Sequence, residues 1–111
     1  MPRSAPRLSI VVLPFSDLSA DRDQQYLADG ITEDLTADLS RLDMLVISRN
    51  TAFSYRDKSI QTRRIGHELG VRYVLEGTVR RAGNKVRVSA QLIDAETDTH
   101  LWAERFDRKN R

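Results

Sequence analysis

The final third of the chain has an alternation of apolar and polar residues that predicts three antiparallel strands. Residues 72–107 read RYVLEGTVRRAGNKVRVSAQLIDAETDTHLWAERFD. The middle run has the period of a strand with two different faces. Its apolar side is Val86, Val88, Ala90 and Leu92, and its polar side is Lys85, Arg87, Ser89 and Gln91. Residues 82–84 and 96–98 are turn-forming, so we expect a meander of two hairpins. In the last strand, we expect the side that carries Trp102 to face the core.

The first part of the chain alternates short apolar runs with a helical pattern. Residues 8–13 (LSIVVL) are apolar on both faces, as in a strand that is central or covered on two sides, and Pro14 ends this strand. Leucine and isoleucine then recur every four residues over 27–39, which predicts a helix capped by Asp21 or Asp23. A second strand is predicted at residues 45–47, and strand–helix–strand implies a right-handed parallel crossover.

A second helix is predicted from Thr62, a candidate N-cap, to Gly70, a candidate left-handed C-terminal residue. Residues 50–53 predict a short helical turn before it. Gly30 costs about 1 kcal/mol relative to alanine inside a helix, so we expect it to allow close packing or to mark a break. The predicted fold is α/β (α+β), with a single mixed sheet in the order β-α-β-α-β-β-β, a C-terminal antiparallel meander, and helices packed mainly on one face.

Length and composition fit one domain. The chain has 111 residues, of which 40% are hydrophobic and 31% charged, and it has no cysteine, which excludes disulfides and thiolate chemistry. Residues 1–7 are predicted to be a flexible lead-in or linker, residues 8–107 the domain, and residues 108–111 the start of a truncated downstream segment. No apolar run is long enough to predict a membrane span. A cytoplasmic location is predicted, and a periplasmic one is not excluded.

Four basic residues cluster across the first predicted hairpin: Arg80, Arg81, Lys85 and Arg87. They could form an anion-binding or interaction surface, including one for a phosphate backbone. The net charge is only +2, however, and no aromatic residues are interleaved to stack bases. Edge strands commonly carry such charges, so we favour a solvated hairpin tip over nucleic-acid binding.

No residue constellation predicts catalysis, a bound metal or a cofactor. The carboxylates of Asp29, Glu33, Asp34 and Asp38 are interpreted as a solvated helix face, with an arginine partner expected for Asp38. His67 and His100 have no second ligand at a workable spacing, so structural or surface roles are favoured. The serines lack a nucleophile elbow, and no glycine-rich phosphate loop occurs.

The loop after the first strand is the candidate ligand crevice. In open α/β sheets, small ligands bind outside the carboxyl ends of the strands. We therefore predict that a crevice is formed by Phe15, Ser16, Asp17, Ser19 and Asp23. Its acidic side chains argue against a phosphate ligand.

Several stretches together resemble a known bacterial family. They are VLPF, YLADGITEDL, IGHELGVRYVLEGTVRR, RVSAQL and LWAERFD, in this order. The chain resembles, over residues 8–107, the TolB-like amino-terminal domain, which is related to the FlgO domain. This family is found joined to class III adenylate cyclase domains, winged-helix transcription regulators and tetratricopeptide repeats. One departure is Asp98, because the turn before the tryptophan strand usually holds a glycine.

The resemblance implies a non-catalytic regulatory or protein-interaction domain of an adenylate cyclase-type signalling protein. Its implied partners are other domains of the same chain, namely cyclase and helical-repeat domains. The alternatives are a small-ligand sensor and a nucleic-acid-associated module of a transcription regulator. If the last strand, residues 99–106, forms a sheet edge, two copies could also pair as a homodimer.

Overall fold

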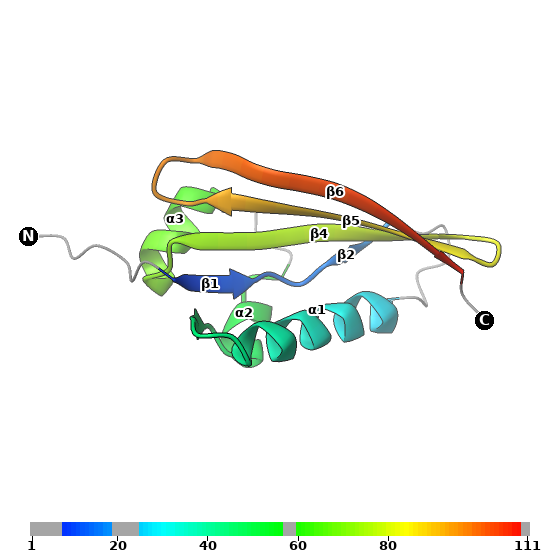
Figure 1. Ribbon diagram of the computed structural model, residues 1–111, viewed down its shortest axis with the longest axis horizontal. Helices are drawn as coiled ribbons and strands as arrows, with labels where there is room; N and C mark the ends of the chain where they lie inside the picture. Colours follow the sequence, from blue (N-terminus) through cyan, green and yellow to red (C-terminus); the bar gives the residue numbers. More distant parts are fainter. Residues whose placement is uncertain (1–7, 19–24, 57–59, 110–111) are drawn as a thin grey trace, which may run out of the picture.

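The computed structural model describes residues 8–18, 25–56 and 60–109, and these form one mixed sheet with helices packed against it (Figure 1). The sheet order is β3-β1-β4-β5-β6, and β2 pairs with β4 beside this path. β1 runs parallel to β3 and β4, whereas β4, β5 and β6 are antiparallel. The elements are β1 (Ser9–Val12), β2 (Ser16–Asp17), α1 (Gln25–Ser40), β3 (Leu45–Val46), α2 (Arg49–Phe53), α3 (Thr62–Leu69), β4 (Tyr73–Ala82), β5 (Lys85–Asp94) and β6 (Thr99–Lys109).

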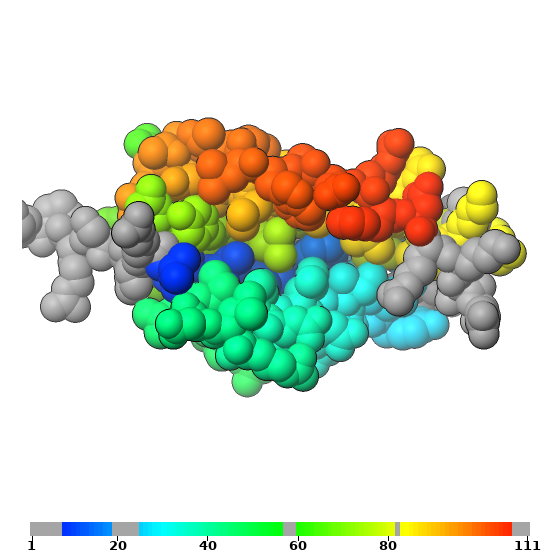
Figure 2. Space-filling model, viewed as in Figure 1, coloured from blue at the N-terminus to red at the C-terminus, as the bar shows by residue number. Residues whose placement is uncertain are grey.

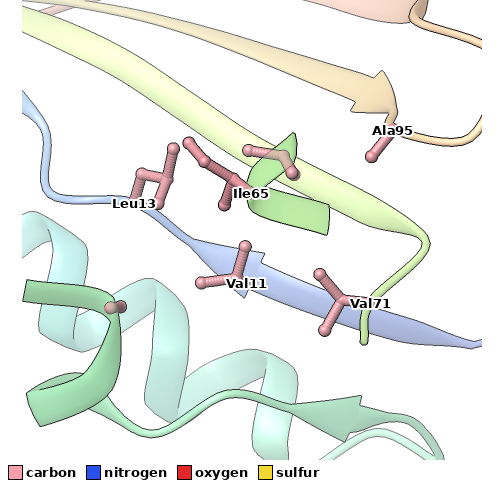
Figure 3. Close-up of a cluster of buried hydrophobic side chains, with 7 residues drawn as sticks. Val11, Leu13, Ile65, Val71 and Ala95 are labelled. Atoms are coloured by element: carbon pink, nitrogen blue, oxygen red, sulfur yellow. The ribbon is translucent and has the colours of Figure 1, made fainter. Parts of the chain in front are cut away.

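The central strand β1 is buried on both faces. Val11 and Val12 are each fully buried, and neighbouring residues of a strand point to opposite faces. Val11 joins a cluster with Ile65 of α3 and Ala52 of α2 (Figure 3). Val12 joins a second cluster with Ala28 of α1 and with apolar residues of β4 and β5. Residues 8–13 were predicted to form a strand that is central or covered on both faces, and the structure confirms this for β1.

The predicted class, the single mixed sheet and the C-terminal meander are confirmed. The placement of the helices differs from the expectation that they pack mainly on one face. α1 covers one face, and α2 and α3 cover the other, because both apolar sides of β1 must be removed from water. The short strand β2 was also not expected, since residues 15–22 read as a loop.

The helix boundaries depend on local chemistry. α1 is continuous through Gly30, and a Cβ atom at that position would meet nothing within 4 Å, so neither close packing nor a break accounts for this glycine. The proposed caps Asp21 and Asp23 lie outside the described residues. α3 is preceded by Gln61 as N-cap rather than Thr62, and it ends at Gly70, whose φ of 68° confirms the predicted left-handed residue.

The meander extends beyond the helices as a long arm (Figure 1). The side chains of its outer strand are exposed from Thr99 to Asp107. Its turns use Gly83 and Asp98 at positive φ, 62° and 55°, so the aspartate occupies the left-handed region in place of glycine. The expectation that the Trp102 side faces the core is wrong. Trp102 is 40% exposed, because α1 covers β4 and β5 but does not extend over β6.

Candidate binding cleft

An open cleft of about 930 Å³ lies beside the segment that joins β1 to β2. One wall is this segment, and another is formed by residues that follow α2. Strands β4 and β5 form the floor. The polar side chains that line it are Ser16, Asp17, Gln25, Tyr55, Arg56, Glu76, Thr78 and Gln91.

Hydrogen bonds to α1 and β4 hold the β1–β2 segment in place. The Phe15 N–H donates to Thr32 Oγ1 at 2.9 Å, and the Thr32 hydroxyl donates to the Ala28 carbonyl oxygen at 2.9 Å. Leu18 N–H donates to the Val79 carbonyl oxygen at 2.8 Å. Thr32 is fully buried, so its hydroxyl satisfies a backbone donor that water cannot reach. The wall of the cleft is thus a fixed segment rather than a free loop.

Gly77 lets this wall approach the sheet. A Cβ atom at this position would lie 2.1 Å from the Ser89 carbonyl oxygen of β5 and 2.6 Å from Cε2 of the Phe15 ring. Both distances are far inside van der Waals contact. The buried Phe15 ring therefore packs directly on the backbone of β4.

A polar network links the cleft to both helical layers. Gln25 Nε2 donates to the Phe15 carbonyl oxygen at 3.3 Å and to Asp29 Oδ1 at 3.0 Å. Asp29 also forms an ion pair with Arg56, whose guanidinium lies 4.8 Å from the centre of the Phe53 ring. These contacts tie the residues after α2 to α1. The ion pair with Asp29 also neutralises the charge of Arg56. Asp17 and Glu76 contribute two further carboxylate groups to the lining of the cleft.

Glu76 is a half-buried titratable group in the lining of the cleft. It projects from β4 beside Gln91 of β5, which donates through Nε2 to Glu76 Oε1 at 3.1 Å. Burial raises the pKa of Glu76, and the nearby His100 and the hydrogen bond from Gln91 partly oppose this rise. A raised carboxyl pKa means that the folded protein holds this proton more tightly than the unfolded chain does.

We predict that Glu76→Gln stabilises the domain at neutral pH but not in acid. The folded pKa is raised, so wild-type stability falls as pH rises above the ordinary pKa of glutamate, because the burial of the charge opposes folding. The glutamine side chain keeps an acceptor for Gln91 and does not titrate. Thermal unfolding of the wild type and of Glu76→Gln should be followed from acid pH, below the ordinary pKa of glutamate, to neutral pH. The two melting temperatures should converge in acid and separate toward neutral pH. A difference in melting temperature that does not change with pH would contradict this role of Glu76.

The structure places part of the predicted crevice in this cleft. Phe15, Ser16 and Asp17 line it, whereas Ser19 and Asp23 lie outside the described residues. The sequence reading missed Arg56, Glu76 and Gln91. Glu76 and Gln91 come together only through the pairing of β4 with β5. Arg56 lies in a stretch of sequence without the periodicity of a helix or a strand.

The basic residues of the first hairpin do not form one surface. Arg80 and Arg87 are opposite each other in the β4–β5 register, so they share a face, whereas Arg81 is opposite Val86 on the other face. Arg87 is bound by Asp107 of β6, with Nε–Oδ1 and Nη2–Oδ2 distances of 2.8 and 3.3 Å. This pairing leaves Arg80 and Lys85 as the remaining cations of the predicted set on that face.

Three of the four acidic residues of α1 have arginine partners, Asp29 being paired with Arg56, and the fourth, Asp34, is exposed. Glu33 and Asp38 pair with Arg49 and Arg41 at 2.8 and 2.6 Å, so the predicted partner of Asp38 is confirmed as Arg41. Both histidines are exposed.

Within residues 8–18, 25–56 and 60–109, no group of three or more histidine, aspartate or glutamate side chains could hold a metal ion. None of the helices in the described part of the chain has the length and apolarity needed to span a bilayer.

The fold and the cleft define an α+β domain built on a mixed sheet with a long antiparallel arm. Residues 6–111 match the family model for the second domain of HilA/YgeH-like transcriptional regulators, and the chain belongs to this family. It is also 54% identical over 108 residues to putative adenylate cyclase 3 of Rhizobium meliloti (strain 1021). That alignment covers 96% of this chain but 18% of the relative, so the chain corresponds to a small part of a longer protein.

Two solved structures are similar in fold. Lipoprotein GNA1162 from Neisseria meningitidis superposes with a TM-score of 0.76 at 21% identity, over 93% of this chain and 81% of that one. TolB from Acinetobacter baumannii superposes with a TM-score of 0.62 at 20% identity, over 97% of this chain and 24% of that one. These likenesses concern the fold alone. They show that the fold resembles that of part of TolB. The tetratricopeptide association stays a prediction.

Proposed function

We propose that this chain is a non-catalytic regulatory or protein-interaction domain of an adenylate cyclase-type signalling protein. The observation that carries the proposal is its 54% identity to a segment that makes up 18% of a protein named as a putative adenylate cyclase. A segment of this size leaves most of the relative's length for other domains. The domain boundaries near residues 8 and 107, a cytoplasmic location, and cyclase and helical-repeat domains as partners are parts of the same proposal.

The test compares the full-length protein with a variant from which residues 8–107 are deleted. We expect the isolated domain with ATP and a divalent metal ion to form no cyclic AMP. We also expect the deletion to change the basal rate or the regulation of cyclic AMP formation by the full-length protein. Turnover by the isolated domain, or a deletion variant with unaltered activity and regulation, would overturn the proposal.

A second candidate function is a small-ligand sensor, and the cleft favours it. Its volume lies within the range of about 300–1,000 Å³ that is typical of ligand sites, and its lining includes amide, hydroxyl and carboxyl groups. Thermal-shift screening with nucleotides and polar metabolites tests this function. A ligand whose stabilising effect is lost in Thr78→Val, but kept in the surface control Thr97→Val, would support it. A flat response across the panel would count against it.

A nucleic-acid-associated role is the third candidate, and the family's link to transcriptional regulators is its support. The structure weakens the electrostatic case, because Asp107 binds Arg87 and Arg81 faces the opposite side of the sheet from Arg80. If the role is correct, DNA binding should weaken steeply with salt and on the charge reversal Arg80→Glu. Binding that is absent at low salt would exclude it.

A further inference from the structure

Strand β6 forms a long, uncovered edge of the sheet. It runs for 11 residues, and it pairs with β5 on one side only. All side chains from Thr99 to Asp107 are exposed, and Figure 2 shows this strand, in orange to red, along one margin of the molecule. The opposite edge, β3, has only two residues. A long edge with free backbone donors and acceptors is a template for another strand.

The side chains of β6 are unusual for an edge that stays in water. Trp102 and Phe106 are 40% and 47% exposed, with ring centres 6.3 Å apart, and they are opposite Leu92 and Val88 of β5. They therefore lie on the same face as α1, beyond the area that α1 covers. The other face of β6 carries Arg105 and Asp107. Soluble proteins generally protect long edges, and β6 combines apolar residues with charges of both signs.

We propose that β6 pairs with β6 of a second copy of this chain, antiparallel and about a two-fold axis through Phe106. This inference is independent of the proposed function. A two-fold axis perpendicular to the sheet joins two identical strands so that residues equally far from the axis are opposite each other. The two sheets then continue into one, and each face of β6 meets the same face of its partner.

Charge complementarity selects this register. With the axis at Phe106, the two phenylalanine rings are opposite each other, and Arg105 of each copy is opposite Asp107 of the other. An axis at Glu104 or at Arg105 would instead place identical charges opposite each other, which is unfavourable. Axes at Trp102 and Ala103 create no pair between a carboxylate and an arginine. The register at Phe106 therefore gives two symmetric ion pairs that flank an aromatic contact.

The first experiment uses an introduced thiol, because the chain has no cysteine of its own. Phe106→Cys should form a disulfide-linked dimer under mild oxidation, since directly opposite residues in an antiparallel pair have Cα atoms about 4.5–5.5 Å apart, within disulfide reach. Trp102→Cys is the matched control. In this register its two copies lie about 26 Å apart along the strands, so it should remain unlinked.

The second experiment exchanges charges. Arg105→Asp and Asp107→Arg each place like charges opposite each other, so each variant alone should sediment as a monomer at concentrations where the wild-type chain dimerises. An equimolar mixture of the two variants restores both opposite-charge pairs and should form a heterodimer. Arg41→Asp reverses another exposed arginine, away from β6, and should dimerise as the wild type does.

The two experiments together decide the proposal. A wild-type chain that is monomeric at all concentrations would overturn it, as would linking of Trp102→Cys that equals that of Phe106→Cys. Dimerisation that survives either single charge reversal would also overturn the register. The proposal predicts that Phe106→Cys forms a disulfide-linked dimer and that the two charge-reversal variants dimerise only when they are mixed. These two results together would establish that β6 pairs with β6 and that the axis lies at Phe106.

Discussion

Replacing Gly77 by alanine is expected to destabilise this domain by about 3 kcal/mol or more, at the upper end of overpacking effects. The added methyl group would meet the Ser89 carbonyl oxygen at 2.1 Å and the Phe15 ring at 2.6 Å. The first of these atoms belongs to the backbone of the neighbouring strand, so a change of rotamer cannot relieve the contact. Either the β4–β5 ladder opens or the ring leaves the core.

The same chemical change at Gly30 is the matched control. Gly30 lies inside α1, and an added Cβ atom would meet nothing within 4 Å. Gly30→Ala should therefore stabilise the domain by up to about 1 kcal/mol, because alanine restricts the unfolded chain and favours the helix. Urea unfolding followed by far-UV circular dichroism measures both variants. Equal effects at the two positions would show that the packing at Gly77 is not as tight as described.

The second large effect is expected for Phe15→Ala, which should cost about 3–5 kcal/mol. The Phe15 side chain is 1% exposed and joins α1 to β4 and β5 in one apolar cluster. Its removal leaves a cavity beneath the cleft, because Gly77 contributes no side chain to fill it. We also expect loss of any ligand that binds in the cleft, since the Phe15 backbone is part of the wall.

Phe106→Ala is the control for this truncation. Phe106 is 47% exposed on the edge strand, so the change should alter the unfolding free energy of the monomer by about 0.5 kcal/mol or less. Unfolding at low protein concentration keeps dimerisation from contributing. A large loss of stability in Phe106→Ala would mean that β6 is packed in the monomer, contrary to its exposure.

The fold could be predicted because its signals are local. The alternation from Val86 to Leu92 and the positions of Gly70 and Gly83 each report on a few neighbouring residues, and the structure confirms them. The prediction for Trp102 failed because alternation reveals two faces but does not reveal which face another element covers. α1 is too far from β6 to bury that side.

The candidate site was predictable only in part. Phe15, Ser16 and Asp17 follow the first strand, and that position alone indicated a crevice. Glu76 and Gln91 are 15 positions apart in sequence, and they meet only because the hairpin register places them opposite each other. The raised pKa of Glu76 likewise depends on burial that no local pattern reports.

The sequence by itself determined the order of strands and helices, the meander and its turns, because backbone preferences and periodicity act over short distances. The tertiary structure alone decided three further features. They are the division of the helices between two faces, the cleft beside Phe15 and Gly77, and the uncovered edge of β6. Each depends on which distant segments pack together, and that outcome follows from burying both sides of β1 rather than from any single segment.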